Sequence, residues 1–198
     1  MMRKLLVIVL IAALSLTMLT FLAGCGGSDA NTEDAKSYMS TGDGYMDSAE
    51  MDWIALDEMQ ADLATQIMGG DLTAVTGEAG EALQQEFEVA FDGLSSALDS
   101  AKAEYEKIRA LDGVQDYKDY ASKMIEAINV YENALDSAIK LADDFQAALA
   151  AMAAGEDIDF VTMMMENEDL ALVSELRGQG DDLVDEAKQI QQDKKLAE

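Results

Sequence analysis

The chain has 198 residues, of which 40 are Asp or Glu and 13 are Lys or Arg, giving a formal net charge of −27. A surface of this charge repels nucleic acid phosphates and anionic lipid head groups, so both are poor candidates as partners. Histidine is absent and there is one cysteine, which removes the commonest general base and metal ligand and any disulfide within the chain.

The first 24 residues have the layout of a secretory signal sequence. Arg3 and Lys4 precede an uncharged, largely apolar stretch at residues 5–24. A stretch of this length is also compatible with a permanent transmembrane helix. It ends in the letters LAGC at residues 22–25, which are followed by the polar, glycine-rich segment GGSDANTED.

The LAGC tetrapeptide resembles the lipobox of prokaryotic lipoproteins. The resemblance implies that residues 1–24 are removed and that Cys25 becomes the lipid-bearing first residue of the mature chain. We therefore expect a lipoprotein anchored in the cell membrane through Cys25 and lying on the extracytoplasmic side. Residues 25–34 are expected to form a flexible tether and residues 35–198 one domain. A buried structural cysteine is the competing interpretation of Cys25.

The composition of the remaining chain favours long helices. Apolar residues make up 49% of the sequence, aromatic residues only 6%, and proline does not occur. A chain rich in Ala, Leu, Glu, Gln and Asp without proline is typical of uninterrupted helices with an aliphatic core. The sequence therefore predicts an all-α fold.

The first predicted helix follows an apolar stripe from residue 35 to residue 67. The stripe consists of Ala35, Tyr38, Gly42, Tyr45, Ala49, Leu56, Met59, Leu63 and Ile67. Asp52 occupies the position where a further apolar residue is expected. Gly42 and Gly44 predict a kink, or a helix that begins only after Gly44. Trp53 lies off this stripe and, if exposed, is our candidate contact residue.

The middle of the chain contains the clearest periodicity. After an irregular connection at residues 68–81, which we expect to be a mobile loop, apolar residues recur at steps of four and three. They are Leu83, Phe87, Ala90, Leu94, Ala97, Ala101, Tyr105 and Ile108. A glycine-containing turn at residues 109–116 then predicts an antiparallel return.

The third and fourth predicted helices continue the same pattern. The third has a heptad seam of Tyr117, Ala121, Met124, Ile128, Tyr131, Leu135, Ala138, Ala142, Phe145, Leu149 and Met152. The fourth carries Val173, Leu176, Gly180, Leu183, Ala187 and Ile190. Gly178 and Gly180 lie inside this last helix at a cost of about 1 kcal/mol each relative to alanine, so a neighbour approaches closely there or the helix bends.

Four amphipathic helices joined by short turns predict an antiparallel up-down bundle with heptad-like packing. A three-helix core with a detached first helix is the structural alternative. Pairing of the long seam between two chains leaves a dimer open.

The sequence contains no pattern that points to catalysis or to a cofactor. Phosphate-binding glycine motifs are missing, and 40 acidic residues make any single carboxylate pair uninformative. We expect a protein that is not an enzyme, with no catalytic residues and no cofactor. Three consecutive methionines at residues 163–165 suggest Cu(I), but successive side chains of a helix diverge, so packing is the preferred interpretation.

Two acidic clusters provide oxygen ligands without the spacing of an EF-hand. They are Asp43, Asp47 and Glu50 in one cluster, and Glu156, Asp157 and Asp159 in the other. Both also suit the start of a helix, where negative charge is favourable. We expect weak, nonselective divalent cation binding and no dedicated metal site.

Two functions of different classes follow from these observations. The first is a non-catalytic binding or scaffolding bundle for an envelope protein partner. The second is a small-ligand or cation-binding domain that serves a sensor or transporter, with its site lined by interhelical tyrosines. A core without voids favours the scaffold, and a cavity lined by tyrosines with a convergent charge favours the ligand.

Overall fold

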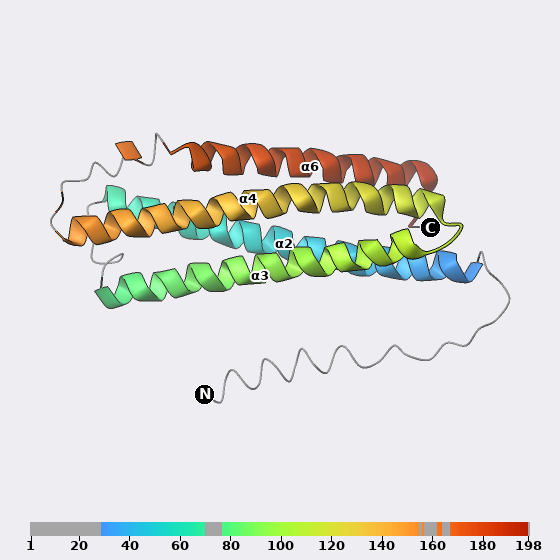
Figure 1. Ribbon diagram of the computed structural model, residues 1–198, viewed down its shortest axis with the longest axis horizontal. Coiled ribbons are helices and arrows are strands. Elements are labelled where there is room, and N and C mark those ends of the chain that lie inside the picture. The colour runs from blue at the N-terminus through green and yellow to red at the C-terminus, as the bar shows by residue number, and fades with distance from the viewer. Residues whose placement is uncertain (1–28, 70–76, 155, 157–161, 164–166, 198) are drawn as a thin grey trace, which may run out of the picture.

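Four long helices lie side by side along one axis in the computed structural model, which describes residues 29–69, 77–154, 156, 162–163 and 167–197 (Figure 1). They are α2 (Asp29–Met68), α3 (Gly77–Ala110), α4 (Gln115–Ala153) and α6 (Glu168–Lys194). Successive helices run in opposite directions. The prediction of an all-α, up-down four-helix bundle is confirmed.

The helices do not pack equally closely on all sides of the bundle. Helix α2 packs along α3, α3 along α4, and α4 along α6. Helix α4 therefore has two close neighbours, and it buries a wider arc than one heptad seam, including Tyr120, Ile125, Ala127 and Ala134. Helices α2 and α6 approach each other less closely, and long side chains bridge them.

The predicted seams of α3 and α4 are confirmed, and the seam of α2 is displaced by one residue from the predicted stripe at three turns. The buried side of α2 runs through Met39 and the half-buried Met46, whereas Tyr45 is 39% exposed. Trp53 fills the position that the sequence placed at Asp52. With Ala35, Gly42, Ala49 and Leu56, these residues recur at steps of four and three. Adjacent Tyr-Met pairs have similar hydrophobicity, so composition alone did not fix the register.

Close packing against tyrosine rings explains two helical glycines. A Cβ at Gly42 would lie 2.8 Å from Cε1 of Tyr105, and a Cβ at Gly180 would lie 2.5 Å from Cε1 of Tyr131. Both rings are buried, and each gains contacts with the bare helix backbone. Helix α2 therefore continues through residues 42–44, and the prediction of a start after Gly44 is wrong.

The helix ends show the predicted turn and a stop at the C-terminus. Gly113 has a φ of 78° in the short connection between α3 and α4, a conformation that glycine adopts without strain. Asn167 caps α6 by accepting a hydrogen bond from the Asp169 backbone N–H at 2.8 Å. After α6, Leu196 is buried, and its carbonyl accepts a hydrogen bond from the Tyr117 hydroxyl at 3.0 Å.

Several predictions fall on residues outside the described part of the chain. The signal sequence, Cys25, residues 70–76 and Met164–Met165 belong to this group. The predicted loop at residues 68–81 is wrong for residues 77–81, which form the first turns of α3. Helix α2 begins at Asp29, within the segment expected to be a tether and before the expected domain boundary at residue 35. Among the described residues, no helix has the length and apolarity needed to cross a membrane.

Candidate functional site

A groove of about 500 Å³ lies between α2 and α6, with α4 at its base. We call it the α2–α6 groove. Its carboxylates are Asp43, Asp47, Glu50, Asp181 and Asp185, and its cationic residues are Arg177 and Lys188. Its aromatic residues are Trp53, Tyr120 and Tyr131, and Met46, Ala49, Ile54, Leu98, Met124, Val184 and Gln191 complete the lining. The groove lies between two helices that do not pack closely against each other.

Asp43 lies at one end of the groove, where the hydroxyl groups of two tyrosines bind its carboxylate. Its Oδ1 accepts hydrogen bonds from the hydroxyls of Tyr105, at 2.7 Å, and Tyr120, at 2.6 Å. The two rings meet edge to face, with centroids 6.0 Å apart. Because both hydroxyls use one oxygen, Oδ2 remains for another partner. The arrangement fixes a carboxylate at the edge of the core.

Burial raises the pKa values of the Asp43 carboxyl and of the two tyrosine hydroxyls that bind it. Desolvation raises the pKa of Asp43 above its ordinary value of 3.8, and it outweighs the lowering effect of the two tyrosine hydrogen bonds. Asp47 nearby raises this pKa further, whereas Lys188 lowers it. Burial, together with the adjacent negative charge, also raises the pKa values of Tyr105 and Tyr120. A cation beside Asp43 would relieve the cost of its charge.

Trp53 and Arg177 lie at the other end of the α2–α6 groove. The guanidinium carbon of Arg177 lies 4.6 Å from the centroid of the indole ring, within the range of a cation–π contact. The same guanidinium donates two hydrogen bonds to the Asp57 carboxylate, at 2.7 and 3.0 Å. Arg177 thus connects α6 to α2 and covers Trp53.

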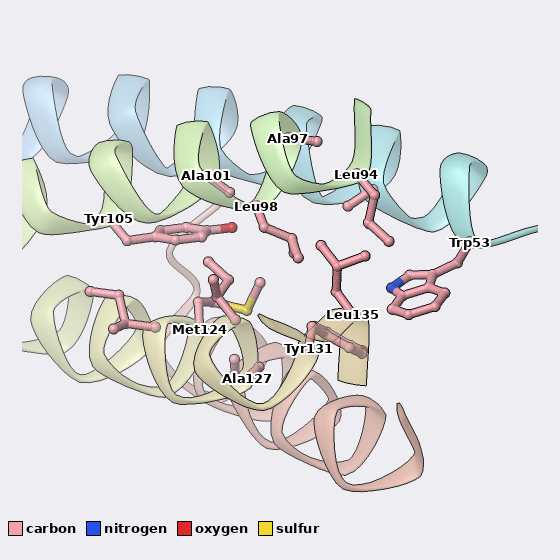
Figure 2. Close-up of a cluster of buried hydrophobic side chains, with 14 of the residues drawn as sticks. Trp53, Leu94, Ala97, Leu98, Ala101, Tyr105, Met124, Ala127, Tyr131 and Leu135 are labelled. Carbon is pink, nitrogen blue, oxygen red and sulfur yellow. The ribbon is translucent and has the colours of Figure 1, made fainter. Parts of the chain in front are cut away.

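The indole N–H of Trp53 has no hydrogen-bond partner. Trp53 is 6% exposed, and among the described residues its Nε1 is the only buried side-chain polar atom without a partner. Figure 2 shows this nitrogen on the side of the ring that faces Tyr131 and Leu135, inside the bundle. A buried donor without an acceptor costs about 1–3 kcal/mol, so this N–H is a local cost within the core.

Tyr131 and Asp181 connect the wall of the groove to its base. The Tyr131 hydroxyl donates a hydrogen bond to Oδ1 of Asp181 at 2.6 Å. Burial and the Asp181 charge raise the pKa of Tyr131, so the hydroxyl keeps its proton as a donor. Gly180 packs on the ring of the same tyrosine. The glycine and the aspartate that follows it therefore position one side chain together.

The groove is chemically suited to a cation with an organic body. Five carboxylates face two cationic side chains, one of which is already paired with Asp57. Aromatic and aliphatic side chains share the walls with these charges. Within the described part of the chain, no group of three or more acidic or cysteine side chains is placed to hold a metal ion. The walls thus favour a molecule over a bare ion.

The structure brings together several residues that the sequence analysis singled out separately. Asp43, Asp47 and Glu50 all line the groove, from within α2 and not at its start. Trp53 is buried, so the condition of an exposed contact residue is not met, but its ring lines the groove. Met163 is half-buried, and most of the second acidic cluster lies outside the described residues.

The contribution of α6 was not found from the sequence. Arg177, Asp181 and Lys188 line the groove, although α6 was considered only for its apolar stripe and its glycines. Gly180 was the available signal, because a glycine inside a helix at a seam position indicates close approach of a bulky neighbour. That neighbour is Tyr131.

Comparison with protein-family models, curated proteins and solved structures finds no match to this chain.

Proposed function

We propose that the protein is a lipid-tethered, extracytoplasmic helical bundle that binds a small organic cation in the α2–α6 groove. The observation that carries this proposal is the groove itself, which combines five carboxylates with three aromatic residues in a volume of about 500 Å³. Pockets for small molecules have volumes of about 300–1,000 Å³ and combine apolar walls with a few oriented polar groups. The role is that of a binding domain serving a sensor or transporter, without catalysis.

Each wall supports a different part of the interaction. The Asp43 carboxylate is fixed by two hydroxyls, so little side-chain entropy is lost when it meets a cation. The rings of Trp53 and Tyr131 provide flat apolar surface, and the net negative charge of the chain attracts cations from solution. The Cys25 anchor would keep this site at the membrane surface, beside a membrane protein that receives the ligand.

A thermal-shift screen of the full chain, purified in a neutral detergent, tests the proposal. Small organic amines and divalent ions are compared at matched ionic strength, because any cation screens a charge of −27. A ligand that binds only the folded state stabilises it by about 2.7 kcal/mol at one hundred times its dissociation constant. We expect a saturable rise in Tm for particular amines and small, uniform shifts for divalent ions.

Two matched variants locate the effect. Asp47→Asn removes one carboxylate from the groove, whereas Asp99→Asn removes one from the exposed side of α3. The amine-dependent rise in Tm should shrink in Asp47→Asn and stay unchanged in Asp99→Asn. Equal loss in both variants would show that the amine responds to overall charge, and the groove would then not be the binding site.

A further inference from the structure

Two contacts between α2 and α6 show which residues of the two helices face each other across the groove. Near one end, Gln191 Nε2 donates to the sulfur of Met39 at 3.8 Å, and near the other, Arg177 donates to Asp57 at 2.7 Å. The two helices run in opposite directions (Figure 1), so the positions between these contacts pair in reverse order. Interpolation gives three successive facing pairs along the groove, namely Asp43 with Lys188, Asp47 with Asp185, and Glu50 with Asp181.

The electrostatic environment of two groups agrees with this pairing. Burial raises the pKa of Asp43 and Lys188 acts against it, so the charge of Lys188 reaches that carboxylate. Burial and Asp181 raise the pKa of Tyr131, and Glu50 adds to this effect, so both carboxylates act on one hydroxyl. The first facing pair thus brings opposite charges together, and the third brings like charges together.

The cationic side chains of the groove lie at its ends. Lys188 faces Asp43 at one end, and Arg177 is held on Asp57 by two hydrogen bonds at the other. The groove-lining residues of the described chain include no further Lys or Arg. The second and third facing pairs therefore consist of carboxylates alone, with no cation of the protein placed between them.

The distance between these two carboxylate pairs along the groove sets the spacing of the charges that would complement them. Asp47 and Glu50 are three residues apart in α2, and Asp181 and Asp185 are four residues apart in α6. These separations correspond to rises of about 4.5 and 6 Å along the helix axes. An extended diamine with three or four methylene groups separates its two nitrogens by about 5–6 Å, given ordinary bond lengths.

The part of the groove between the two carboxylate pairs is lined by apolar side chains. Ala49 lies between the two acidic residues of α2, and Val184 lies between those of α6. Leu98 and Met124 add to this lining from α3 and α4. Methylene groups placed here leave water for an apolar surface, a gain that two separate hydrated metal ions do not have.

Building on the proposed function, we infer that the ligand is a short aliphatic diamine with three or four methylene groups. One ammonium group lies at the second facing pair, the other lies at the third, and the methylene chain lies on Ala49 and Val184. Lys188 and Arg177 limit the length of the ligand, because a longer diamine brings its ammonium groups toward these two cations.

Four amines separate the parts of this inference. They are butylamine, 1,3-diaminopropane, 1,4-diaminobutane and 1,8-diaminooctane. Isothermal titration calorimetry of the full chain in neutral detergent, at matched ionic strength, gives the affinity of each. We expect the better of the two short diamines to bind at least about tenfold more tightly than butylamine or 1,8-diaminooctane. Butylamine leaves one carboxylate pair without a cation, and the nitrogens of 1,8-diaminooctane are too far apart for the two pairs.

Asp185→Asn and Asp182→Asn are matched variants that locate the second ammonium group. Both positions are exposed on α6, so both variants are expected to fold, but only Asp185 lines the groove. Asp185→Asn should weaken the binding of 1,4-diaminobutane by about threefold or more and bring its affinity closer to that of butylamine. Asp182→Asn removes the same charge outside the groove and should leave the ratio of the two affinities unchanged.

The possible failures are distinguishable. Equal binding of butylamine and the short diamines would overturn the assignment of two ammonium groups, while the organic-cation site stands. An affinity that rises steadily up to 1,8-diaminooctane would overturn the inferred spacing. Equal effects of Asp185→Asn and Asp182→Asn would overturn the placement at the facing pairs. If no amine in the series or in the wider screen binds, the proposed function itself fails.

Discussion

Glycine has two different roles in helices α2 and α6. Gly42 and Gly180 lie under tyrosine rings, whereas Gly44 and Gly178 have no atom of another residue near an added Cβ. At the first pair a methyl group meets a buried ring, and at the second pair it meets open space. The same substitution should therefore have opposite effects at neighbouring positions.

Gly180→Ala should destabilise the protein, and Gly178→Ala should stabilise it. The Tyr131 ring is 8% exposed and its hydroxyl is bonded to Asp181, so it has little freedom to move away from a new methyl group. Overpacking costs about 1–3 kcal/mol, which exceeds the gain in helix propensity. At Gly178 an added methyl group meets no neighbour, so Gly178→Ala should show only the gain in helix propensity, up to about 1 kcal/mol. Urea unfolding followed by circular dichroism measures both, and shifts of the same sign would contradict the packing described here.

The Asp43 carboxylate should make the pH dependence of stability run opposite to that of a typical aspartate. Its folded pKa is raised, so the folded state binds more protons than the unfolded state between 3.8 and the folded pKa. The free energy of unfolding of the wild type, relative to Asp43→Asn, should rise as the pH falls through that window. The neighbours of Asp43 from every packed helix, namely Tyr105, Tyr120, Asp47 and Lys188, are present in both proteins and cancel in the difference.

Urea unfolding of wild type and Asp43→Asn across the acid range provides this comparison. A relative stability of the wild type that falls as the pH is lowered would show that hydrogen bonding outweighs desolvation at Asp43. The amide oxygen that Asp43→Asn introduces can still accept from both tyrosines, so the variant bundle is expected to fold.

At the scale of elements, side chains hold α2 and α6 together where their backbones are apart. Arg177 joins them through Asp57 and covers the indole of Trp53. Arg177→Gln should cost about 1 kcal/mol, the usual size of a cation–π contact and a partly exposed ion pair. It should also shift the emission of Trp53 to longer wavelength and increase its quenching by acrylamide, because the ring loses its cover.

Lys140→Gln is the matched control for this variant. Lys140 pairs with Asp169 at 2.6 Å between α4 and α6, on a side that does not line the groove. This control should leave Trp53 emission unchanged. Unchanged emission in Arg177→Gln as well would show that Arg177 does not cover the indole in solution.

The helices were predictable from sequence, but the face of α2 was not. Periodicity located all four helices because apolar spacing reports directly which side of a helix is dry. At Tyr38-Met39 and Tyr45-Met46 both members of the pair are apolar, and the sequence alone does not show that the methionine is the more buried member of each pair. The groove was harder still, since its residues come from α2, α3, α4 and α6 and become neighbours only in the folded bundle.

At the scale of the whole molecule, the signal sequence at residues 1–24 can be tested separately from the helical bundle. The resemblance of residues 22–25 to a lipobox predicts a mature protein that begins at Cys25 and carries lipid there. Mass spectrometry of the protein extracted from cell membranes should show this mass. Cys25→Ser should retain residues 1–24, because the residue that accepts the lipid is missing. A wild-type protein with Met1 intact would contradict the lipid anchor.

The proposal that the α2–α6 groove holds an organic cation is tested most directly by titrating the full chain with small amines while following Trp53 emission. Trp53 is the single tryptophan and lines the groove, so its emission reports occupancy of this site. At matched ionic strength we predict a saturable change, with one amine bound per chain, that is weakened in Asp47→Asn. A small change of equal size for every amine and for magnesium would mean that only the acidic surface is being screened, and would contradict a binding site in the groove.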